Sequence, residues 1–234
     1  MTAGAKTGRS GIVGLRRSGA SDNMAGADLP VLDARWARIA TLHADEKRVL
    51  RETLLILAGG HGPTAAELAR RTRLPDERVR EALTGLDAHD LVVLKEDRVV
   101  VAYPFTVQEV PHQVVSSLGV GRTCCAIDAL GVGAMLNETI EIHSHCSRCG
   151  APLHLRGNER FQGTRERPVV SIPSMEAVQG KVIDCLCPAI NFYCSEDHGR
   201  AHLAESGGRG SLASLDDATA IGIAAFGKLL DLLK

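Results

Sequence analysis

Two short cysteine segments hold the most reactive side chains of this chain. Cys125 is followed three residues later by Asp128, and Cys187 lies in a Cys-Leu-Cys-Pro segment that begins at Cys185. Thiolates are the ligands that soft metals prefer over oxygen and nitrogen. A carboxyl group nearby can accept a thiol proton and deliver it elsewhere. The two segments therefore predict a site that binds a soft metal and transfers a proton.

The place of Cys125 in the local structure determines how reactive its thiol is. Residues 125–136 are apolar enough to form a buried helix, with Cys125 at or near its start. There the helix dipole lowers a thiol pKa, so thiolate is expected near neutral pH. Asp128 falls on the same helix face as Cys125. The alternative is a buried cysteine that acts as a small hydrophobe, with Asp128 satisfying the dipole, and these two residues alone favour that alternative.

A second group of residues has the spacing of a zinc site. Cys146 and Cys149 form a Cys-x-x-Cys turn, and Cys194 and His198 are four residues apart. Together these four would complete a tetrahedral structural zinc site. The alternative is that the cysteines are ordinary turn and core residues and that the histidine faces solvent.

Composition and charge are those of an ordinary globular protein. The chain has 234 residues, of which 44% are hydrophobic, so it can build one large or two small domains. A net charge of -1 implies no overall attraction to nucleic acid or to a membrane. No apolar run approaches the roughly 18 residues of a membrane span, and no signal peptide is evident. Seven cysteines, clustered as neighbours, favour a reducing cytoplasm over a secreted disulfide framework.

The N-terminal half is predicted to contain an extension and a small helical module. Residues 1–29 are rich in Gly, Ala, Ser and Arg without periodicity, which predicts a disordered extension with Met24 as an alternative start. Residues 30–103 begin with two helical apolar stripes. A short helix capped by Thr64, a second helix over 77–86 and a hairpin of 91–94 with 99–102 follow. This order predicts a winged helix-turn-helix-like module.

Residues 104–234 are predicted to form a second domain of mixed type. Short strand-like and helix-like segments occur without regular βαβ repeats, which indicates an α+β domain. The expected strands lie at 114–120, 139–143, 168–172 and 189–193, and the expected helices at 125–136, 195–204 and 213–233.

The predicted helix 77–86 is the element that would read DNA in a winged helix. It offers Arg78 and Arg80, but Glu77 and Glu81 stand beside them. A helix that neutralises its own cations is a poor reader of phosphates or base edges. We therefore expect a packing module or lid, and no nucleic-acid partner.

Three segments together resemble the organomercurial lyase (alkylmercury lyase) family. They are residues 123–130 around Cys125-Ala126-Ile127-Asp128, residues 143–152, and residues 187–195. The resemblance covers about residues 31–234, including the N-terminal module. It implies a catalytic domain at 104–234 and an enzyme that cleaves the carbon–mercury bond by protonolysis, releasing a hydrocarbon and Hg(II).

The resemblance gives each matching residue an expected role. Cys125 and Cys187 match the two mercury-binding cysteines, Asp128 matches the proton-shuttling aspartate, and Cys146 matches a cysteine of structural character. No organic cofactor is implied, because mercury arrives with the organomercurial substrate. The implied partners are small cellular thiols and a mercuric reductase that receives Hg(II). The chain departs from the family at Cys124, which is expected to face the core because adjacent helical side chains diverge by about 100°.

Two other functions are compatible with the same residues. A zinc- or mercury-responsive regulator would use the winged helix on DNA, and the mixed charge of residues 77–86 argues against it. A non-catalytic thiol metal-binding protein of the same fold would need only the thiols, so Asp128 argues against it. The sequence leaves open the preferred organic group, the oligomeric state and the roles of Cys124, Cys149, Cys185 and Cys194.

Overall fold

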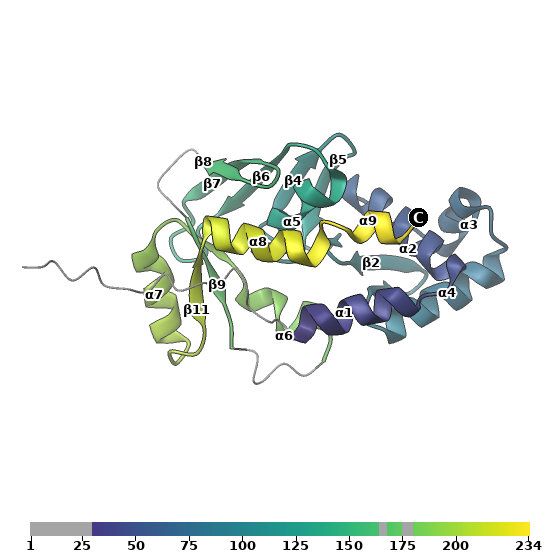
Figure 1. Ribbon diagram of the computed structural model, residues 1–234, viewed down its shortest axis with the longest axis horizontal. Coiled ribbons are helices and arrows are strands. Elements are labelled where there is room, and N and C mark those ends of the chain that lie inside the picture. Colours follow the sequence, from purple (N-terminus) through teal and green to yellow (C-terminus); the bar gives the residue numbers. More distant parts are fainter. Residues whose placement is uncertain (1–29, 164–167, 175–179) are drawn as a thin grey trace, which may run out of the picture.

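A computed structural model describes residues 30–163, 168–174 and 180–234 (Figure 1). The described helices are α1 (Pro30–Thr41), α2 (Ala44–Ala58), α3 (Ala65–Thr72), α4 (Asp76–Ala88), α5 (Ala126–Leu136), α6 (Val182–Cys185), the 3-10 helix η3 (Cys187–Ala189), α7 (Glu196–Glu205), α8 (Leu215–Phe226) and α9 (Leu229–Leu232). The described strands are β1 (Val92–Lys95), β2 (Arg98–Ala102), β3 (Phe105–Thr106), β4 (Gln113–Ser116), β5 (Gly119–Thr123), β6 (Ile140–His145), β7 (Pro152–Gly157), β8 (Phe161–Gly163), β9 (Val169–Ile172), β10 (Phe192–Tyr193) and β11 (Ser211–Ser214). The predicted extension at 1–29, with Met24, lies outside the described residues.

The helices of the N-terminal half form because their apolar residues fall on one face. In α2, Leu50, Leu54 and Leu57 lie on the buried side, at helical spacing. Thr64 caps α3, since its hydroxyl accepts a hydrogen bond from the Glu67 N–H at 3.2 Å. Helix α4 and the β1–β2 hairpin follow at the expected positions. Their interpretation as a winged helix stays a prediction.

An eight-stranded antiparallel sheet runs through both halves of the chain, in the order β1-β2-β3-β5-β4-β6-β7-β8. Strand β3 pairs with β2, where Thr106 lies opposite Val101, and with β5, where Phe105 lies opposite Thr123. The ladder therefore continues past residues 103–104, where the sequence predicted a domain boundary that stays a prediction. A second sheet has the order β10-β9-β11. This mixture of helices and antiparallel strands confirms the predicted α+β class.

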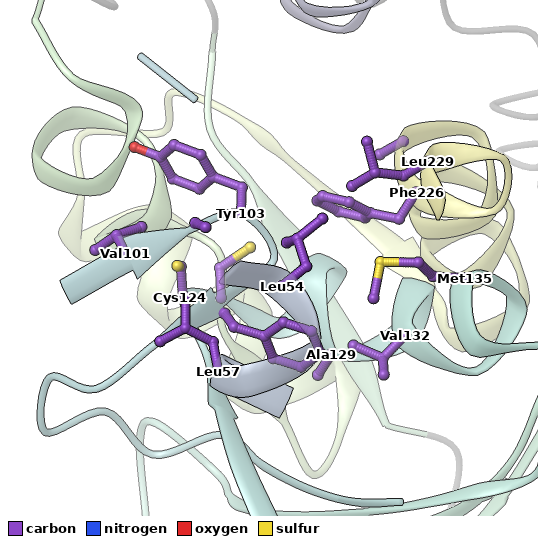
Figure 2. Packing of buried hydrophobic residues seen from close by; sticks show 14 of the residues in the cluster. Leu54, Leu57, Val101, Tyr103, Cys124, Ala129, Val132, Met135, Phe226 and Leu229 are labelled. Carbon is purple, nitrogen blue, oxygen red and sulfur yellow. The ribbon is translucent and has the colours of Figure 1, made fainter. Parts of the chain in front are cut away.

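A shared core holds the helix that carries Cys125 and Asp128. Figure 2 shows Leu54 and Leu57 of α2 in one buried cluster with residues of α5, α8 and α9. Helix α5 lies against α8 (Figure 1) at a close backbone approach, because a Cβ built on Gly131 would lie 2.5 Å from the Gly222 carbonyl oxygen. Buried packing on several sides therefore fixes the position of α5. No helix in the described ranges is long and apolar enough to cross a membrane.

Two predicted elements differ from those observed. In the strand expected at 189–193, only Phe192–Tyr193 form β10, because Ala189 belongs to η3. The helix expected at 213–233 is preceded by β11, whose residues pair with β9. Ser214 then caps α8 by accepting the Asp217 N–H at 3.1 Å, and the helix is interrupted after Phe226. The sequence reading did not identify β3, β7, β8 or α6.

Candidate active site

The N-terminus of α5 places Cys125 and Asp128 side by side. Cys125 is the N-cap residue, and its Sγ accepts a hydrogen bond from the Asp128 N–H at 3.4 Å. Strand β5 ends at Thr123 and α5 begins at Ala126, so the turn between them sets the direction of the thiol. Both side chains are buried, with 2% of Cys125 and 6% of Asp128 exposed.

A backbone bridge brings Cys187 to the same helix end. Cys187 begins η3 and is buried. The Ile190 N–H donates to the Cys187 carbonyl at 3.1 Å, and the Ile190 carbonyl accepts from the Ala126 N–H at 3.1 Å. That N–H belongs to the first turn of α5, where it has no partner within the helix. As a result, the sulfurs of Cys125 and Cys187 and a carboxylate oxygen of Asp128 lie within 4.8 Å of one another.

Residues from the N-terminal half hold the segment that precedes Cys187. The Tyr103 hydroxyl accepts the Ile183 N–H at 2.9 Å and donates to Asp90 Oδ1 at 3.2 Å. Asp90 Oδ2 accepts the Val182 N–H at 3.0 Å. These contacts fix α6, so the position of Cys187 depends on residues that lie far from it in the chain.

The two thiols and the carboxyl group face a mostly apolar cavity of about 100 Å³. Its apolar lining includes Ile127, Ile172, Leu186, Ile190, Ile221, Ala225 and Phe226, and its polar lining includes Arg35, Arg38, Asp90 and Tyr103. Apolar walls with a few convergent polar groups are typical of a small-molecule site. They also lower the local dielectric constant, so charges inside interact more strongly than in water.

Burial keeps the cavity thiols protonated near neutral pH. Burial raises the pKa of Cys125 well above its usual value, and hydrogen bonding with Cys187 raises it further. Hydrogen bonding with Cys124 raises the pKa of Cys187. The prediction that the helix dipole makes Cys125 a thiolate is therefore wrong for this cavity. The loss of hydration outweighs the stabilisation that the Asp128 N–H gives to the charged sulfur.

Asp128 has a pKa near neutrality. Burial raises the pKa of Asp128 to about 7, while the Arg35 guanidinium and the thiols of Cys125 and Cys124 oppose this rise. Among the described residues, its buried Oδ2 atom has no hydrogen-bond partner. A carboxyl group with a pKa near the working pH and an unengaged oxygen is suited to accept a proton and release it again.

Arg35 of α1 is a residue of this site that the sequence reading missed. Its Nη2 donates to the Tyr103 carbonyl at 2.9 Å, and its guanidinium carbon lies 4.5 Å from the centre of the Phe226 ring. Burial lowers the pKa of Arg35, and the charge of Asp128 opposes that lowering. A signal was present in the sequence, because a charged residue stands on the same helical face as Trp36 and Ile39.

The neighbouring cysteines occupy two different environments. Cys124 is buried among the core residues of Figure 2, as expected. Burial raises the pKa of Cys124 to about 11, while the neighbouring Cys187 thiol lowers it. Cys185 is partly exposed, and its Sγ donates to the Lys181 carbonyl at 3.1 Å. Cys124 therefore adjoins the site, whereas Cys185 does not line the cavity.

A separate cluster contains the four residues predicted as zinc ligands. Cys146 and Cys149 come from the turn between β6 and β7, and Cys194 and His198 come from the junction of β10 and α7. Their ligand atoms lie within 4.8 Å of one another. Burial raises the pKa of Cys146, but the N–H groups of Cys194, Cys149 and Arg148 and the His198 ring together lower it to about 6. The structure thus brings together residues from two distant segments.

These features describe an α+β protein with two buried thiols and a carboxyl group at one apolar cavity. A family model described as MerB, alkylmercury lyase, matches residues 105–227. An alkylmercury lyase of Bacillus cereus is 27% identical over 178 residues, which are 75% of this chain and 79% of the relative. An alkylmercury lyase of Streptomyces lividans is 28% identical over 158 residues, which are 66% and 71% of the two chains.

The chain belongs to the alkylmercury lyase family, and it is a carbon–mercury lyase. A solved structure described as the mercury-bound form of MerB2 shares its fold, with a TM-score of 0.71 and 19% sequence identity. That likeness covers 86% of this chain and 98% of the other. The predicted family membership is therefore confirmed.

Proposed function

We propose that this chain cleaves the carbon–mercury bond by protonolysis, with Cys125 and Cys187 as mercury ligands and Asp128 as the proton shuttle. The observation that carries the proposal is the approach of two thiols and a carboxyl group of pKa about 7 to within 4.8 Å of one another. Two sulfur ligands donate electron density to mercury and weaken its bond to carbon. A proton delivered to that carbon then completes the cleavage.

The reaction balances with the groups in the cavity. The substrate enters as R–Hg–SR′, where R′SH is a small cellular thiol. One cysteine gives its proton to the departing sulfur, which leaves as R′SH, and binds mercury in its place. The second cysteine passes its proton to Asp128 and also binds, because coordination to a metal favours the thiolate. Asp128 then protonates the carbon, the electron pair of the carbon–mercury bond forms the new C–H bond, and Hg(II) stays on two thiolates.

Arg35 keeps Asp128 able to accept the thiol proton. Burial alone favours the neutral acid, which has no free site for a proton, and Arg35 is the largest influence in the opposite direction. The apolar walls exclude water and strengthen this charge interaction. The balance between burial and Arg35 keeps the pKa of Asp128 at about 7. With that pKa, the carboxyl group can accept a proton from a thiol and later donate it to carbon.

The remaining parts of the proposal concern partners and organisation. The scheme needs no organic cofactor, and mercury enters with the substrate. Hg(II) held by two thiolates leaves by exchange with other thiols, and a mercuric reductase is the class of enzyme that would receive it. We interpret residues 30–103 as a winged-helix-like module and residues 104–234 as the catalytic domain. The family model, which begins at residue 105, supports this division.

A DNA-binding regulator is not favoured by the charges of α4. Arg80 pairs with Asp76 at 3.2 Å, and Arg78 pairs with Asp45. Cations that are already paired within the protein have less to gain from DNA phosphates.

Substitution of Asp128 separates proton delivery from mercury binding. Asp128→Asn keeps the size and polarity of the side chain but cannot carry a proton. We expect it to take up about one organomercurial per chain and to release hydrocarbon at least about 100-fold more slowly, the low end for a positioned acid–base group. The assay uses a methyl- or phenylmercury salt with excess small thiol and measures both quantities on the same preparation.

Cysteine variants complete this test. Cys125→Ala and Cys187→Ala should each abolish hydrocarbon release, because a single thiolate cannot both extract and activate mercury. Cys185→Ser changes a thiol that does not line the cavity and should turn over normally. Loss of both binding and activity in Asp128→Asn would make Asp128 a ligand or a structural cap. Normal turnover by that variant would mean that another group, such as Cys124, carries the proton.

A further inference from the structure

The cluster between the β6–β7 turn and α7 has the ligand set of a closed zinc site. Three thiols and one imidazole fill the four positions of a tetrahedral metal and leave none for a substrate, as in structural zinc sites. We propose that Cys146, Cys149, Cys194 and His198 bind a structural zinc ion. This proposal does not rest on mercury chemistry at the other site.

Three of the six distances between the four ligand atoms are close to those of a tetrahedral zinc site, and all six are within 4.8 Å. With Zn–S bonds of about 2.3 Å and Zn–N bonds of about 2.0–2.1 Å, two sulfurs lie about 3.8 Å apart, and sulfur lies about 3.5 Å from nitrogen. The sulfurs of Cys149 and Cys194 are 3.8 Å apart. His198 Nδ1 lies 3.5 Å from Cys146 Sγ and 3.2 Å from Cys194 Sγ.

Backbone hydrogen bonds hold both ligand segments in place. The Cys146 N–H donates to the Ala151 carbonyl at 2.8 Å, and the Gly150 N–H donates to the Cys146 carbonyl at 2.9 Å. Gly150 has a φ of 71°, which glycine adopts without strain. On the other segment, the Ser195 hydroxyl caps α7 by accepting the His198 N–H at 3.3 Å. The ligands are therefore positioned by their own local structure, as a preformed site needs.

Neither a disulfide nor a hydrogen-bonded group of thiols accounts for this geometry as well as a metal does. A disulfide would require a sulfur–sulfur distance of about 2.05 Å, whereas Cys149 and Cys194 are free and 3.8 Å apart. Hydrogen bonding among thiols would not require four ligand atoms to converge from two segments, two on each. Soft thiolates with one imidazole in tetrahedral array select zinc among the common divalent ions.

The proposed zinc would connect two parts of the fold. Cys149 and Cys194 are 45 residues apart in the chain, and they follow strands of different sheets. The Ser147 N–H already donates to the Phe192 carbonyl at 3.0 Å, beside this junction. Because Phe192 follows the segment that carries Cys187, the metal would fix the far end of that segment.

Metal analysis of the full chain tests the proposal without measuring activity. Protein purified from zinc-supplemented medium should carry about one zinc per chain, and a chelator should lower its Tm by at least about 5 °C. Cys149→Ser and His198→Ala should lose most of this zinc. Cys185→Ser, a matched change of a thiol outside both clusters, and Cys125→Ala, in the other cluster, should keep it.

If the cluster variants fail to fold, the site can still be tested in the unmodified chain by replacing zinc with Co(II). Strong visible absorption from tetrahedral cobalt with thiolate ligands is expected. The proposal is overturned if protein with all seven thiols reduced carries no zinc and gives no such spectrum. It is also overturned if Cys149→Ser and His198→Ala fold and keep their zinc. If Asp128→Asn releases hydrocarbon at the normal rate, the proposed mercury mechanism fails. The zinc proposal still stands if the unchanged chain carries about one zinc and Cys149→Ser loses it.

Discussion

Replacing Arg35 by methionine tests whether the cavity tunes Asp128 for proton transfer. Methionine keeps an unbranched side chain of similar length against Phe226, but it removes the charge that opposes the effect of burial on Asp128. The carboxylate form must be present to accept the thiol proton, so hydrocarbon release should rise with pH through the Asp128 pKa, with a midpoint near pH 7. Loss of the positive charge raises that pKa, and the midpoint moves to higher pH.

The size of the effect follows from the ionised fraction of Asp128. At pH 7 and a pKa of about 7, about half of the molecules hold the carboxylate. A neighbouring opposite charge typically shifts a carboxyl pKa by about 1–3 units. A rise of one unit leaves about a tenth ionised, which is about a fivefold loss of rate at pH 7, and a rise of two units gives about a 50-fold loss. The loss should diminish at higher pH, where the carboxylate form returns.

The assay measures kcat/KM for hydrocarbon release between pH 6 and pH 9.5, with mercury uptake and Tm on the same samples. Arg35→Lys keeps the charge and should hold the midpoint closer to that of the unchanged protein. Arg38→Met is the matched control, because Arg38 lies one turn further along α1 and donates to the His89 carbonyl at 2.8 Å. It should leave the midpoint close to pH 7, since Arg38 is not among the main influences on the pKa of Asp128.

Three outcomes would refute this reasoning. A uniform loss of activity at every pH, with an unchanged midpoint, would make Arg35 a packing residue without electrostatic influence on the shuttle. A midpoint that moves to lower pH would contradict the expected sign, because loss of a cation raises the pKa of a nearby acid. Hydrocarbon release that falls as pH rises would mean that Asp128 acts from its protonated form.

Two further predictions concern packing and DNA. Gly131→Ala should destabilise the protein by about 1–3 kcal/mol, seen as a lower Tm, because the new Cβ would meet the Gly222 carbonyl oxygen at 2.5 Å; an unchanged Tm would show that α5 and α8 can separate at little cost. The full chain should leave no specific footprint on DNA at physiological salt, because the cations of α4 are paired, and a protected site upstream of its own gene would revive the regulator hypothesis.

Local sequence patterns were sufficient to predict the helix that carries Cys125 and Asp128, but not the short helix that carries Cys187. The apolar stretch after Cys125 predicted α5 and its start, and the three-residue spacing predicted that Cys125 and Asp128 lie together. Thr64 and Glu67 predicted the cap of α3. These succeed because helix periodicity and capping depend on residues within one or two turns. The ligand types of the four-residue cluster were also readable, because a Cys-x-x-Cys turn and a Cys–His pair are short patterns.

Contacts between distant segments could not be read in the same way. Cys187 lies beside Cys125 because the Ile190 carbonyl accepts the Ala126 N–H. Helix α6 is held in place because the Tyr103 hydroxyl accepts the Ile183 N–H. Strands β3 and β10 have two residues each, too few to show the alternating pattern of a strand, although Phe, Thr and Tyr all favour strands, so their bounds depend on their neighbours in the sheet.

The protonation states of Cys125 and Asp128 were the property of the site that the sequence alone could not predict. From the sequence, the helix dipole suggested that Cys125 is a thiolate, whereas burial raises the pKa of Cys125 and brings that of Asp128 to about 7. The identities of the two thiols and the carboxyl group are a property of the sequence. Their protonation depends on how much water the surrounding core removes and on where Arg35 comes to lie, and both are set by residues distant in the chain.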